Sequence, residues 1–585
     1  MEAVMEDART EHEDGWTVRK IGVIGAGIVG VPMAALLAEA GVRIGTDRPA
    51  PVVLVQRPSA TSGWKVEALN AGRSPIGGIE PDLDRIVRGT VADGRLRAAS
   101  ACAEIADADA VLICVQTDRK GLEPDYGPLV EAVASLADVL KPRPGGPPPL
   151  IVFESTLAPT TMATWAASEF ARFGLRDGRD ILLGHSPNRV MPGRLIERIR
   201  SADKIAGGLT PTAARRIRAL YSGFMGEGRL HATNALTAEI VKTLENAYRD
   251  VRIAFSAEVA RRCDAADVDF HRVRTEVNAR LFCEAGLPPE TAGAPHGLLT
   301  PTVGVGGHCL PKDGILLLWR LIESGADVSE SLILEARRIN DESPAATAAR
   351  LEEAFGNLRN RALALMGTAY RPDSEDTRNS PTLVLARILS GMGSRVVLHD
   401  PFVNPGDANL VRSGFADRFT RGLEDAVGPA EIVVFCAAHA AYRGLPAALL
   451  APGGKSRKMF DGCGLTGPGT GMRGPAAVPG IGKGRNAPAP AFLDFVHASF
   501  RAVELGVANE IAALTDFLNA GFACDAFGRA DFREVRRLAA TCVTGCRIVE
   551  PGPVDAPLPS VGSAFRLVRR AGAASAGGAA ARERT

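Results

Sequence analysis

One cysteine in the chain has sequence neighbours that could activate it as a nucleophile. Cys309 follows the pair Gly306 and Gly307 in the stretch VGVGGHCLPKDG, and Lys312 and Asp313 come within four residues. A nucleophilic cysteine needs its thiolate favoured by a nearby cation or a helix N-terminus. Lys312 is such a cation, and Asp313 could position a base or a water molecule. We interpret Cys309 as a candidate nucleophile; a small core cysteine in a glycine turn is the alternative.

A second candidate group lies on a predicted helix. From Ala235 to about Cys263 apolar residues recur at helical spacing without Gly or Pro, which predicts one long helix. Lys242 and Asn246 are four residues apart and share a face of it. An ammonium beside a side-chain amide could hold a developing oxyanion. On spacing alone, a surface lysine and an incidental asparagine remain the alternative. A further helix is expected from Gly314 to about Asn340.

A glycine-rich turn near the N-terminus indicates nucleotide binding. The motif GAGIVG supplies Gly25, Gly27 and Gly30 between an apolar strand and an apolar-faced helix. The first glycine permits a tight turn, the second close approach to a pyrophosphate, and the third close helix–strand packing. The pattern predicts a dinucleotide site, with a merely tight turn as the alternative.

The next strand bears on the choice of cofactor. A dinucleotide fold places an acid at the end of its second strand, where it binds a ribose hydroxyl. The expected strand APVVLVQRPS ends instead in Gln56 and Arg57, unless the strand ends at Asp47 in VRIGTDR. A carboxylate favours NAD, whereas an arginine without it tolerates the 2′-phosphate of NADP. The choice stays open, with NAD preferred.

The remaining pattern predicts an α/β protein. Continuous apolar runs at residues 108–117 and 149–156 are typical of buried parallel strands. Near residue 360 alternating strand and helix patterns restart without a GxGxxG motif, so the ligand of this second α/β unit need not be a dinucleotide. The Gly/Pro-rich residues 464–486 are expected to be a linker or large loop, and residues 490 to about 550 are apolar enough to fold.

The bulk properties exclude several classes of protein. At 585 residues the chain is expected to form several domains, and its net charge of +1 does not favour a nucleic-acid partner. No apolar run approaches the roughly 20 residues of a membrane span, and the acidic N-terminus is no signal peptide. Ten scattered cysteines suggest a reducing cytoplasm. Cys542 and Cys546 form neither a CxxC pair nor a convincing zinc half-site, so no metal is expected.

Taken in order, these stretches resemble the nucleotide-sugar 6-dehydrogenases, the family of UDP-glucose, GDP-mannose and UDP-N-acetylmannosamine dehydrogenases. The resemblance runs from about residue 20 to 465, some three quarters of the chain. The matching stretches are IGVIGAGIVGVPMAALLAEAG, KVEALNAGRSPI, ICVQT, FESTLAP, SPNRVMPG, AEIVKTLENAYRDVRIAF, GVGGHCLPKD and RPDSEDTRNSPTLVLARIL.

The resemblance implies two Rossmann-like doubly wound domains joined by a long central helix that forms a homodimer interface. The implied parts are an NAD-binding domain (19–233), a central helical dimerisation and catalytic domain (234–345) and a UDP-sugar-binding domain (346–465). The polar lead (1–18) and the low-complexity tail (569–585) are expected to be disordered. Residues 466–568 are an extension of unknown role without a family counterpart.

The implied reaction is a four-electron oxidation of the C6 hydroxymethyl of a UDP-sugar to the UDP-uronate, with NAD as acceptor, for polysaccharide biosynthesis in the cytoplasm. A catalytically altered or non-catalytic nucleotide-sugar binder is one alternative, and a two-electron hydroxyacid-type dehydrogenase is another. The intact Gly-Gly-His-Cys loop speaks against the second. Which sugar is oxidised does not follow from the sequence.

The resemblance also assigns roles to residues. Cys309 matches the nucleophile that forms a thiohemiacetal and then a thioester. Lys242 and Asn246 match the residues that stabilise oxyanions, and Asp313 and Thr117 match those that hold water. The expected cofactor contacts are Gly25, Gly27, Ile28, Val29, Gly30, Gln56, Arg57, Thr117, Glu154 and Thr156. The expected substrate contacts are Asn188, Lys242, Asn246, Gly306 and Arg371. Arg378 matches a common family arginine with a structural role.

One position departs from the family pattern. In SPNRVMPG the family usually has a glutamate, acting as general acid and base, where this chain has Asn188. An asparagine cannot take up a proton near neutral pH. Either water and Asp313 do that work, or the thioester step is slower, or the chemistry is adjusted.

Overall fold

The chain folds into two compact units. The first contains Met1–Glu245, Leu316–Ala326 and Ile511–Arg547, and the second contains Asn246–Ile315, Asp327–Glu510 and Ile548–Thr585. The computed structural model describes residues 15–59, 62–77, 80, 82–143, 145–189, 193–284, 297–443, 445, 457–466, 478–522, 525–542, 546–553, 566–567 and 570.

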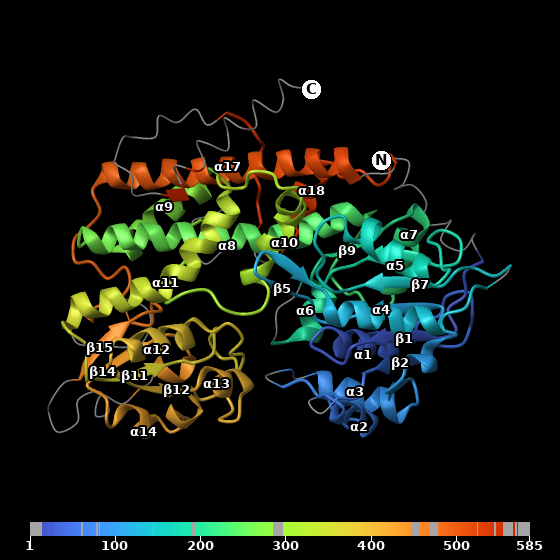
Figure 1. Ribbon diagram of the computed structural model, residues 1–585, viewed down its shortest axis with the longest axis horizontal. Coiled ribbons are helices and arrows are strands. Elements are labelled where there is room, and N and C mark those ends of the chain that lie inside the picture. The colour runs from blue at the N-terminus through green and yellow to red at the C-terminus, as the bar shows by residue number, and fades with distance from the viewer. Residues whose placement is uncertain are drawn as a thin grey trace. The chain divides into compact units, whose positions relative to one another are not determined.

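The first unit is built on an eight-stranded sheet (Figure 1). Its strand order is β10-β9-β8-β7-β4-β1-β2-β3, and every neighbouring pair is parallel except β8 with β9. The strands are β1 (Ile21–Ile24), β2 (Val52–Val55), β3 (Leu96–Ala99), β4 (Ala110–Ile113), β7 (Leu150–Phe153), β8 (Leu182–His185), β9 (Lys204–Gly208) and β10 (Leu230–Asn234). The continuous apolar runs predicted as parallel strands at 108–117 and 149–156 are confirmed as β4 and β7.

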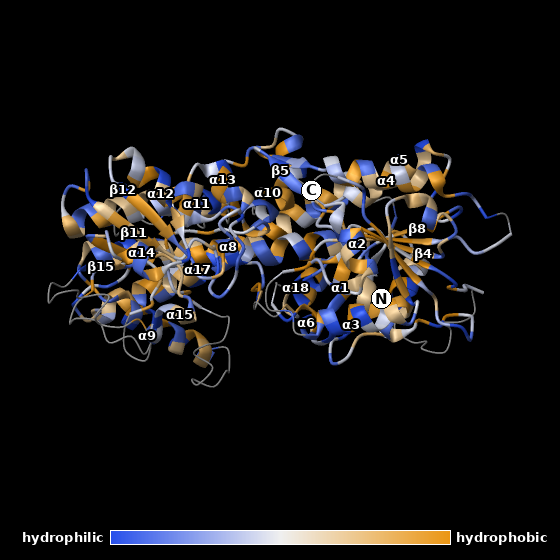
Figure 2. Cartoon of the chain, turned by 90° about the horizontal axis from the view of Figure 1, so that it is seen from below, coloured by the Kyte–Doolittle hydropathy of each residue, from blue (hydrophilic) through white to orange (hydrophobic). Residues whose placement is uncertain are grey.

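Helices cover both faces of this sheet, which explains why the central strands β1, β2, β4 and β7 are apolar throughout. These strands appear orange in Figure 2. One core contains α1, α3, α6 and α7, and the other contains α4 and α5. The helices are α1 (Gly30–Ala40), α2 (Trp64–Asn70), α3 (Leu83–Ala92), α4 (Gly127–Val139), α5 (Ala167–Arg172), α6 (Leu195–Ser201) and α7 (Pro211–Ser222); β5 (Asp118–Lys120) and β6 (Glu123–Asp125) form a separate hairpin.

The prediction of a disordered lead over residues 1–18 is wrong for residues 15–18, which are ordered. Trp16 and Val18 are buried, and Val18 donates its amide to the carbonyl of Ile44 at 2.9 Å. The guanidinium of Arg216 lies over the ring of Trp16. Residues 1–14, and nearly all of the expected tail 569–585, lie outside the described residues.

The long helix predicted from Ala235 is confirmed as α8 (Ala235–Ala265). The single helix predicted from Gly314 to Asn340 is wrong, because the chain forms α10 (Leu310–Glu323) and α11 (Leu332–Phe355). Gly325, at φ +73°, ends α10 by a left-handed turn. Ser331 then caps α11 by accepting from the amide of Leu334.

The second unit contains a five-stranded parallel sheet with the order β13-β12-β11-β14-β15. It confirms the second α/β unit expected from residue 360. Its strands are β11 (Ala362–Met366), β12 (Arg395–His399), β13 (Phe419–Thr420), β14 (Ile432–Phe435) and β15 (Lys458–Asp461). Its helices include α9 (Phe270–Glu284), α12 (Pro381–Gly391), α13 (Ala408–Ser413), α14 (Leu423–Val427) and α15 (Ala440–Arg443).

The C-terminal extension forms two helices, α17 (Pro490–Phe522) and α18 (Phe532–Ala539). In the second unit α17 runs beside α8 (Figure 1), where the rings of Phe500 and Phe255 meet edge to face at 5.6 Å. The hydroxyl of Tyr248 donates to Glu504 at 2.9 Å. Ile511–Arg547 belong instead to the first unit.

The last residues of the predicted linker or large loop at 464–486 form a loop that is packed on the second unit. Lys483 forms an ion pair with the buried Asp461 at 3.1 Å, and Asn486 bridges to Val268. A Cβ at Gly484 would overlap the backbone of Val268, so this glycine permits close packing. Residues 467–477 lie outside the described residues.

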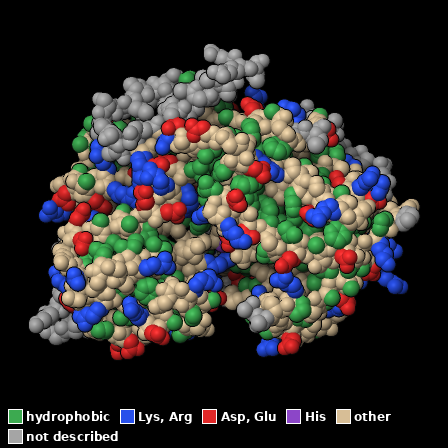
Figure 3. Space-filling model, viewed as in Figure 1, with side chains coloured by type: hydrophobic (Ala, Val, Ile, Leu, Met, Phe, Trp, Pro, Cys, Tyr) green, Lys and Arg blue, Asp and Glu red, His purple; other side chains and the backbone are tan. Residues whose placement is uncertain are grey.

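The surface shows acidic and basic side chains interspersed on the face drawn in Figure 3, which agrees with the net charge of +1. In the described ranges, no helix combines the length and apolar character that a membrane span requires.

Candidate active site

The glycine loop of the first unit follows β1. Gly25 has φ +105°, and a Cβ there would lie 2.8 Å from the carbonyl oxygen of Cys114. A Cβ at Gly30 would overlap the carbonyl oxygen of Gly25, so α1 can begin only with glycine. At Gly27 a Cβ would meet open space. The loop and the start of α1, which also carry Ile28 and Val29, thus leave room for a pyrophosphate.

The residue after β2 is Gln56, so the alternative strand end at Asp47 is wrong. The amide of Ala26 donates to Gln56 Oε1 at 2.9 Å, which fastens this side chain to the glycine loop. Gln56 Nε2 donates to the carbonyl of Arg57 and to the hydroxyl of Ser62. Arg57 is exposed and forms an ion pair with Glu131.

Three further predicted cofactor or water contacts follow β4 and β7. The hydroxyl of the buried Thr117 donates to the carbonyl of Thr156 at 2.8 Å. The carboxylate of Glu154 is buried; it accepts from Lys204 at 2.8 Å and from the hydroxyl of Tyr221 at 2.5 Å. Glu154 therefore takes part in an internal ion pair, and its expected contact with the cofactor stays a prediction.

In the second unit, Cys309 stands immediately before α10. Its carbonyl accepts from the amides of Lys312 and Asp313, which form the first turn of that helix. The half-buried Cys309 therefore lies next to the N-terminus of a helix, the positive end of the helix dipole, where a negative charge is favoured. This is the setting that the sequence analysis expected for a nucleophilic cysteine.

Asp313 is fully buried and joins two neighbouring side chains. One carboxylate oxygen accepts from Asn246 Nδ2 at 2.6 Å, and the other accepts from Lys312 Nζ at 2.6 Å. The structure thus brings Asn246 and Asp313 together from α8 and α10. Lys312, interpreted from the sequence as a cation for the thiolate, pairs with the carboxylate instead.

Lys242 precedes Asn246 by one turn of α8, as the spacing predicts, and is buried rather than on the surface. In the first unit, its charge and that of Lys204 help to lower the pKa of His185 to about 3, although burial is the largest cause. The imidazole of His185 is therefore neutral at the end of β8.

The glycine pair before Cys309 packs against the C-terminal domain of the second unit. A Cβ at Gly306 would lie 2.5 Å from Tyr370 Cβ, and Gly307 has φ +87°. The amide of Gly307 donates to the carbonyl of Arg378 at 2.8 Å. The sequence analysis explained the glycines by close approach of a sugar; the structure supplies a packing reason as well.

Two further residues interact with Cys309, and the sequence analysis did not predict these interactions. Burial and the charges of Asp376 and Cys309 raise the pKa of Tyr370 to about 12. Arg378, expected to be structural, forms an ion pair with Asp376 at 2.6 Å and interacts electrostatically with Cys309. Both residues are linked to the cysteine by proximity in space alone, and no local sequence pattern encodes that proximity. Arg371 is half-buried beside Tyr370 in the chain.

Asn188 is half-buried in the loop after β8. The next residue, Arg189, is buried and forms an ion pair with Glu245 of α8. Its guanidinium also donates to the carbonyl of Leu538 and the hydroxyl of Thr541. The C-terminal extension thereby fixes the loop that carries Asn188. Residues 190–192 of this motif lie outside the described residues.

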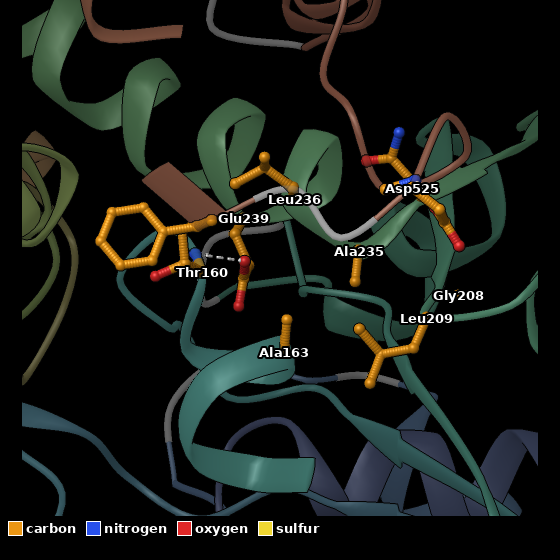
Figure 4. Close-up of a pocket in the computed structure, with 11 residues that line it drawn as sticks. Thr160, Ala163, Gly208, Leu209, Ala235, Leu236, Glu239 and Asp525 are labelled. Carbon is orange, nitrogen blue, oxygen red and sulfur yellow. Dashed lines mark hydrogen bonds between the residues drawn. The ribbon is translucent and has the colours of Figure 1, made fainter. Parts of the chain in front are cut away.

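A cavity of about 200 Å³ lies elsewhere in the first unit (Figure 4). The carboxylate of Glu239 lines it and accepts from the amides of Thr160 and Met162 at 2.7 and 2.8 Å. Burial raises the pKa of Glu239 to about 8. In the portions of the chain that the structure describes, no cluster of His, Cys, Asp and Glu has the composition of a metal site.

Three family models match the chain in order. They are described as the NAD binding domain, the central domain and the UDP binding domain of the UDP-glucose/GDP-mannose dehydrogenase family, and they match residues 19–225, 236–342 and 364–468. The chain belongs to this family.

Relatives and solved structures agree with this family. UDP-N-acetyl-D-mannosamine dehydrogenase of Pyrococcus horikoshii is 33% identical over 389 residues, covering 66% of this chain and 84% of the relative. NDP-N-acetyl-D-galactosaminuronic acid dehydrogenase of Ralstonia solanacearum is 30% identical over 458 residues, covering 76% and 96%. The crystal structure of NDP-N-acetyl-D-galactosaminuronic acid dehydrogenase from Methanosarcina mazei Go1 has a TM-score of 0.64 at 32% identity, covering 81% and 97%.

As a member of the UDP-glucose/GDP-mannose dehydrogenase family, the chain is an NAD-dependent nucleotide-sugar dehydrogenase, and its UDP-binding domain implies a UDP-sugar substrate. The open space at Gly27 and the helix start at Gly30 fit a bound dinucleotide. The extension, including α17 and α18, lies beyond the matched residues.

Proposed function

We propose that this dehydrogenase oxidises the C6 hydroxymethyl group of a UDP-sugar to a carboxylate through a covalent bond to Cys309. One observation carries the proposal: Cys309 immediately precedes α10, and one turn later Asp313 is hydrogen-bonded at 2.6 Å to Asn246 of α8. A two-electron dehydrogenase of the hydroxyacid type has no need of this cysteine.

The residues divide a four-electron oxidation into separate steps. Removal of a hydride from C6 and a proton from its hydroxyl gives the aldehyde. The sulfur of Cys309 then bonds to C6, and the carbonyl oxygen takes up a proton to give a thiohemiacetal. Loss of a second hydride and the hydroxyl proton gives a thioester. Water attacks the thioester, the C–S bond breaks, and the uronate and free thiol result. NAD accepts one hydride at each oxidation when it is bound.

The other residues stabilise charge and position water. Lys242 and Asn246 stabilise the oxyanions that form at C6. Asp313, together with Thr117, orients the water that hydrolyses the thioester. Because Asn188 cannot accept a proton, the proton released by this water passes to Asp313 in our proposal. Gly306 and Arg371 contact the sugar nucleotide.

The parts of the chain divide the work in the same way. In our proposal residues 19–233 hold the cofactor, residues 234–345 supply the nucleophile and the homodimer interface, and residues 346–465 bind the UDP-sugar. The similarity to UDP-N-acetylmannosamine and NDP-N-acetylgalactosaminuronic acid dehydrogenases favours an N-acetylhexosamine substrate. The uronate would then serve polysaccharide biosynthesis.

The test is the yield of reduced cofactor per sugar at the end of the reaction. Purified protein is incubated with NAD and each of UDP-glucose, UDP-galactose, UDP-N-acetylglucosamine and UDP-N-acetylmannosamine, and NADH is measured by its absorbance. Two equivalents with one sugar support the proposal. One equivalent means that oxidation stops at the aldehyde or thioester. No reduction with any sugar favours a non-catalytic binder, for which Asn188 is the supporting feature.

Cys309→Ser tests the nucleophile. Because a hydroxyl cannot form the thioester, uronate production should fall by more than about a thousandfold. Mass spectrometry of the sugar nucleotide measures uronate and aldehyde separately. Cys283→Ser is the matched control, because Cys283 is an exposed free thiol of α9. Full uronate output from the Cys309 variant would remove this cysteine from the mechanism.

A further inference from the structure

The position that sets cofactor choice carries no acid in this chain. Gln56 directly follows β2, which pairs in parallel with β1 from Ile21↔Val52 to Ile24↔Val55. In a dinucleotide fold the side chain at this position faces the adenosine ribose. Its Oε1 lies 2.9 Å from the amide nitrogen of Ala26 in the glycine loop, which places it beside the nucleotide.

The amide of Gln56 is committed to the protein. Oε1 accepts from Ala26, while Nε2 donates to the carbonyl of Arg57 at 3.2 Å and to the hydroxyl of Ser62 at 3.1 Å. The side chain is neutral, so it does not repel a phosphate as an ionised carboxylate would. The usual electrostatic barrier to a 2′-phosphate is therefore missing from this position.

Hydrogen-bond donors surround the same position. Arg57 is the next residue, and the hydroxyls of Ser59 and Ser62 lie 2.6 Å apart in the same loop. Lys65 places its ammonium 3.0 Å from the carbonyl of Ala26. A guanidinium, an ammonium and two hydroxyls are the groups that bind phosphate oxygens.

The partner of Arg57 does not prevent such binding. Arg57 and Glu131 form an ion pair on the surface, with 69% and 55% of their side chains exposed. Exposed pairs of this kind contribute little stability. A phosphate offers the guanidinium two parallel charge-assisted hydrogen bonds, which are stronger. Arg57 can therefore exchange its carboxylate partner for a phosphate.

We propose that the cofactor site of this dehydrogenase admits the 2′-phosphate, so that NADP is bound about as tightly as NAD, with Arg57 as its main contact and Ser59 and Ser62 as secondary contacts. The inference deepens the proposed function, on which it rests for the use of a nicotinamide cofactor. It concerns binding alone, so it can be tested without a sugar substrate.

The experiment measures dissociation constants by isothermal titration calorimetry with the full chain. The probes are NAD⁺ and NADP⁺, and 5′-AMP and 2′,5′-ADP, a pair that differs only by the 2′-phosphate. We expect the NADP⁺ dissociation constant to lie within about tenfold of that for NAD⁺. NADP⁺ binding weaker by more than this factor, with NAD⁺ bound normally, overturns the inference and leaves the proposed function intact.

Two variants locate the contact. Arg57→Ala should raise the ratio of the NADP⁺ to the NAD⁺ dissociation constant by about tenfold or more, because a charge-assisted pair is lost. Gln56→Glu should raise the same ratio, because it restores a carboxylate of equal size. Arg172→Ala is the control, since Arg172 also forms an exposed ion pair, with Glu169 of the same helix.

The outcomes separate the two proposals. An unchanged ratio in both variants overturns the assignment of Arg57 and Gln56. Circular dichroism of each variant shows whether it is folded, and 2′,5′-ADP with the wild-type protein tests the phosphate contact if a variant does not fold. Failure of wild-type protein to bind either cofactor overturns the proposed function together with this inference.

Discussion

Asp313 has a structural role and a proposed catalytic role, and its surroundings allow the two to be tested separately. Its carboxylate is buried between the ammonium of Lys312 and the amide of Asn246, each at 2.6 Å. Removing one partner of a buried ion pair leaves the other charge uncompensated. The same side chain is also the one that we propose to position water at the thioester.

Asp313→Asn should therefore change two measurements. The turnover number with saturating UDP-sugar and NAD should fall by about a hundredfold or more, because the acid–base group is lost. The free energy of unfolding in urea should fall by about 3–5 kcal/mol, because the charge of Lys312 remains buried. Turnover is measured at a temperature where circular dichroism shows the variant folded.

Asp494→Asn is the control for this change. Asp494 forms an ion pair with Arg280 and has 69% of its side chain exposed, so its loss should change stability by less than about 1 kcal/mol. If Asp313→Asn kept wild-type turnover while losing stability, Asp313 would be a structural partner of Lys312 and no part of the reaction.

At the scale of residues, the sequence predicts some features of the candidate site and not others. Helical spacing predicts that Lys242 and Asn246 share a face, and the glycine-rich loop marks Cys309. The contact of Asn246 with Asp313 joins residues 67 positions apart, so only the family resemblance pointed to it. Tyr370 and Arg378 lie 61 and 69 positions from Cys309 in the sequence. Neither residue type is distinctive, which explains why their proximity to the cysteine could not be predicted.

At the scale of elements, local signals decided which helices were predicted correctly. The stretch that forms α8 has no Gly or Pro, and its predicted and observed starts coincide at Ala235. The boundary between α10 and α11 was missed although Gly325 and Ser331 are ordinary stop and start signals. The 33-residue helix α17 was not predicted, because Gly506 and Gly521 have low helix propensity. The helix forms all the same, because packing against α8 outweighs that propensity.

Glu239 of α8 makes stability depend on pH. Burial raises the pKa of its carboxyl from 4.5 to about 8. The folded state therefore holds this proton where the unfolded chain has lost it, so the contribution to stability is complete below pH 4.5 and is lost as pH rises through about 8. The slope is at most about 1.4 kcal/mol per pH unit for one group.

Glu239→Gln should remove this dependence. We expect the difference in unfolding free energy between wild type and variant to shift in favour of the variant as pH rises from 5 to 8, as measured by urea unfolding at each pH. Glu104→Gln, at an exposed ion pair with Arg97, should give a profile parallel to wild type. Parallel profiles for Glu239→Gln as well would show that this carboxyl titrates normally.

At the scale of the whole molecule, the extension beyond the family models is part of the core. In the second unit Glu510 of α17 accepts from the hydroxyl of Ser331 and the amide of Leu332 at the start of α11. In the first unit the ring of Phe522 lies under the guanidinium of Arg320 at 5.2 Å. No composition signal could show this, because the partners of each residue lie more than 150 positions away.

Phe500→Ala tests whether the extension stabilises the fold. Phe500 is 3% exposed and packs edge to face on the fully buried Phe255. Truncating such a ring leaves a cavity in the core, so unfolding in guanidinium should show a loss of about 3–5 kcal/mol. Phe173→Ala is the matched control, because that ring is 43% exposed, and it should cost less than about 1 kcal/mol. Equal small losses for both would mean that α17 is an accessory helix, and that the family domains hold their fold without it.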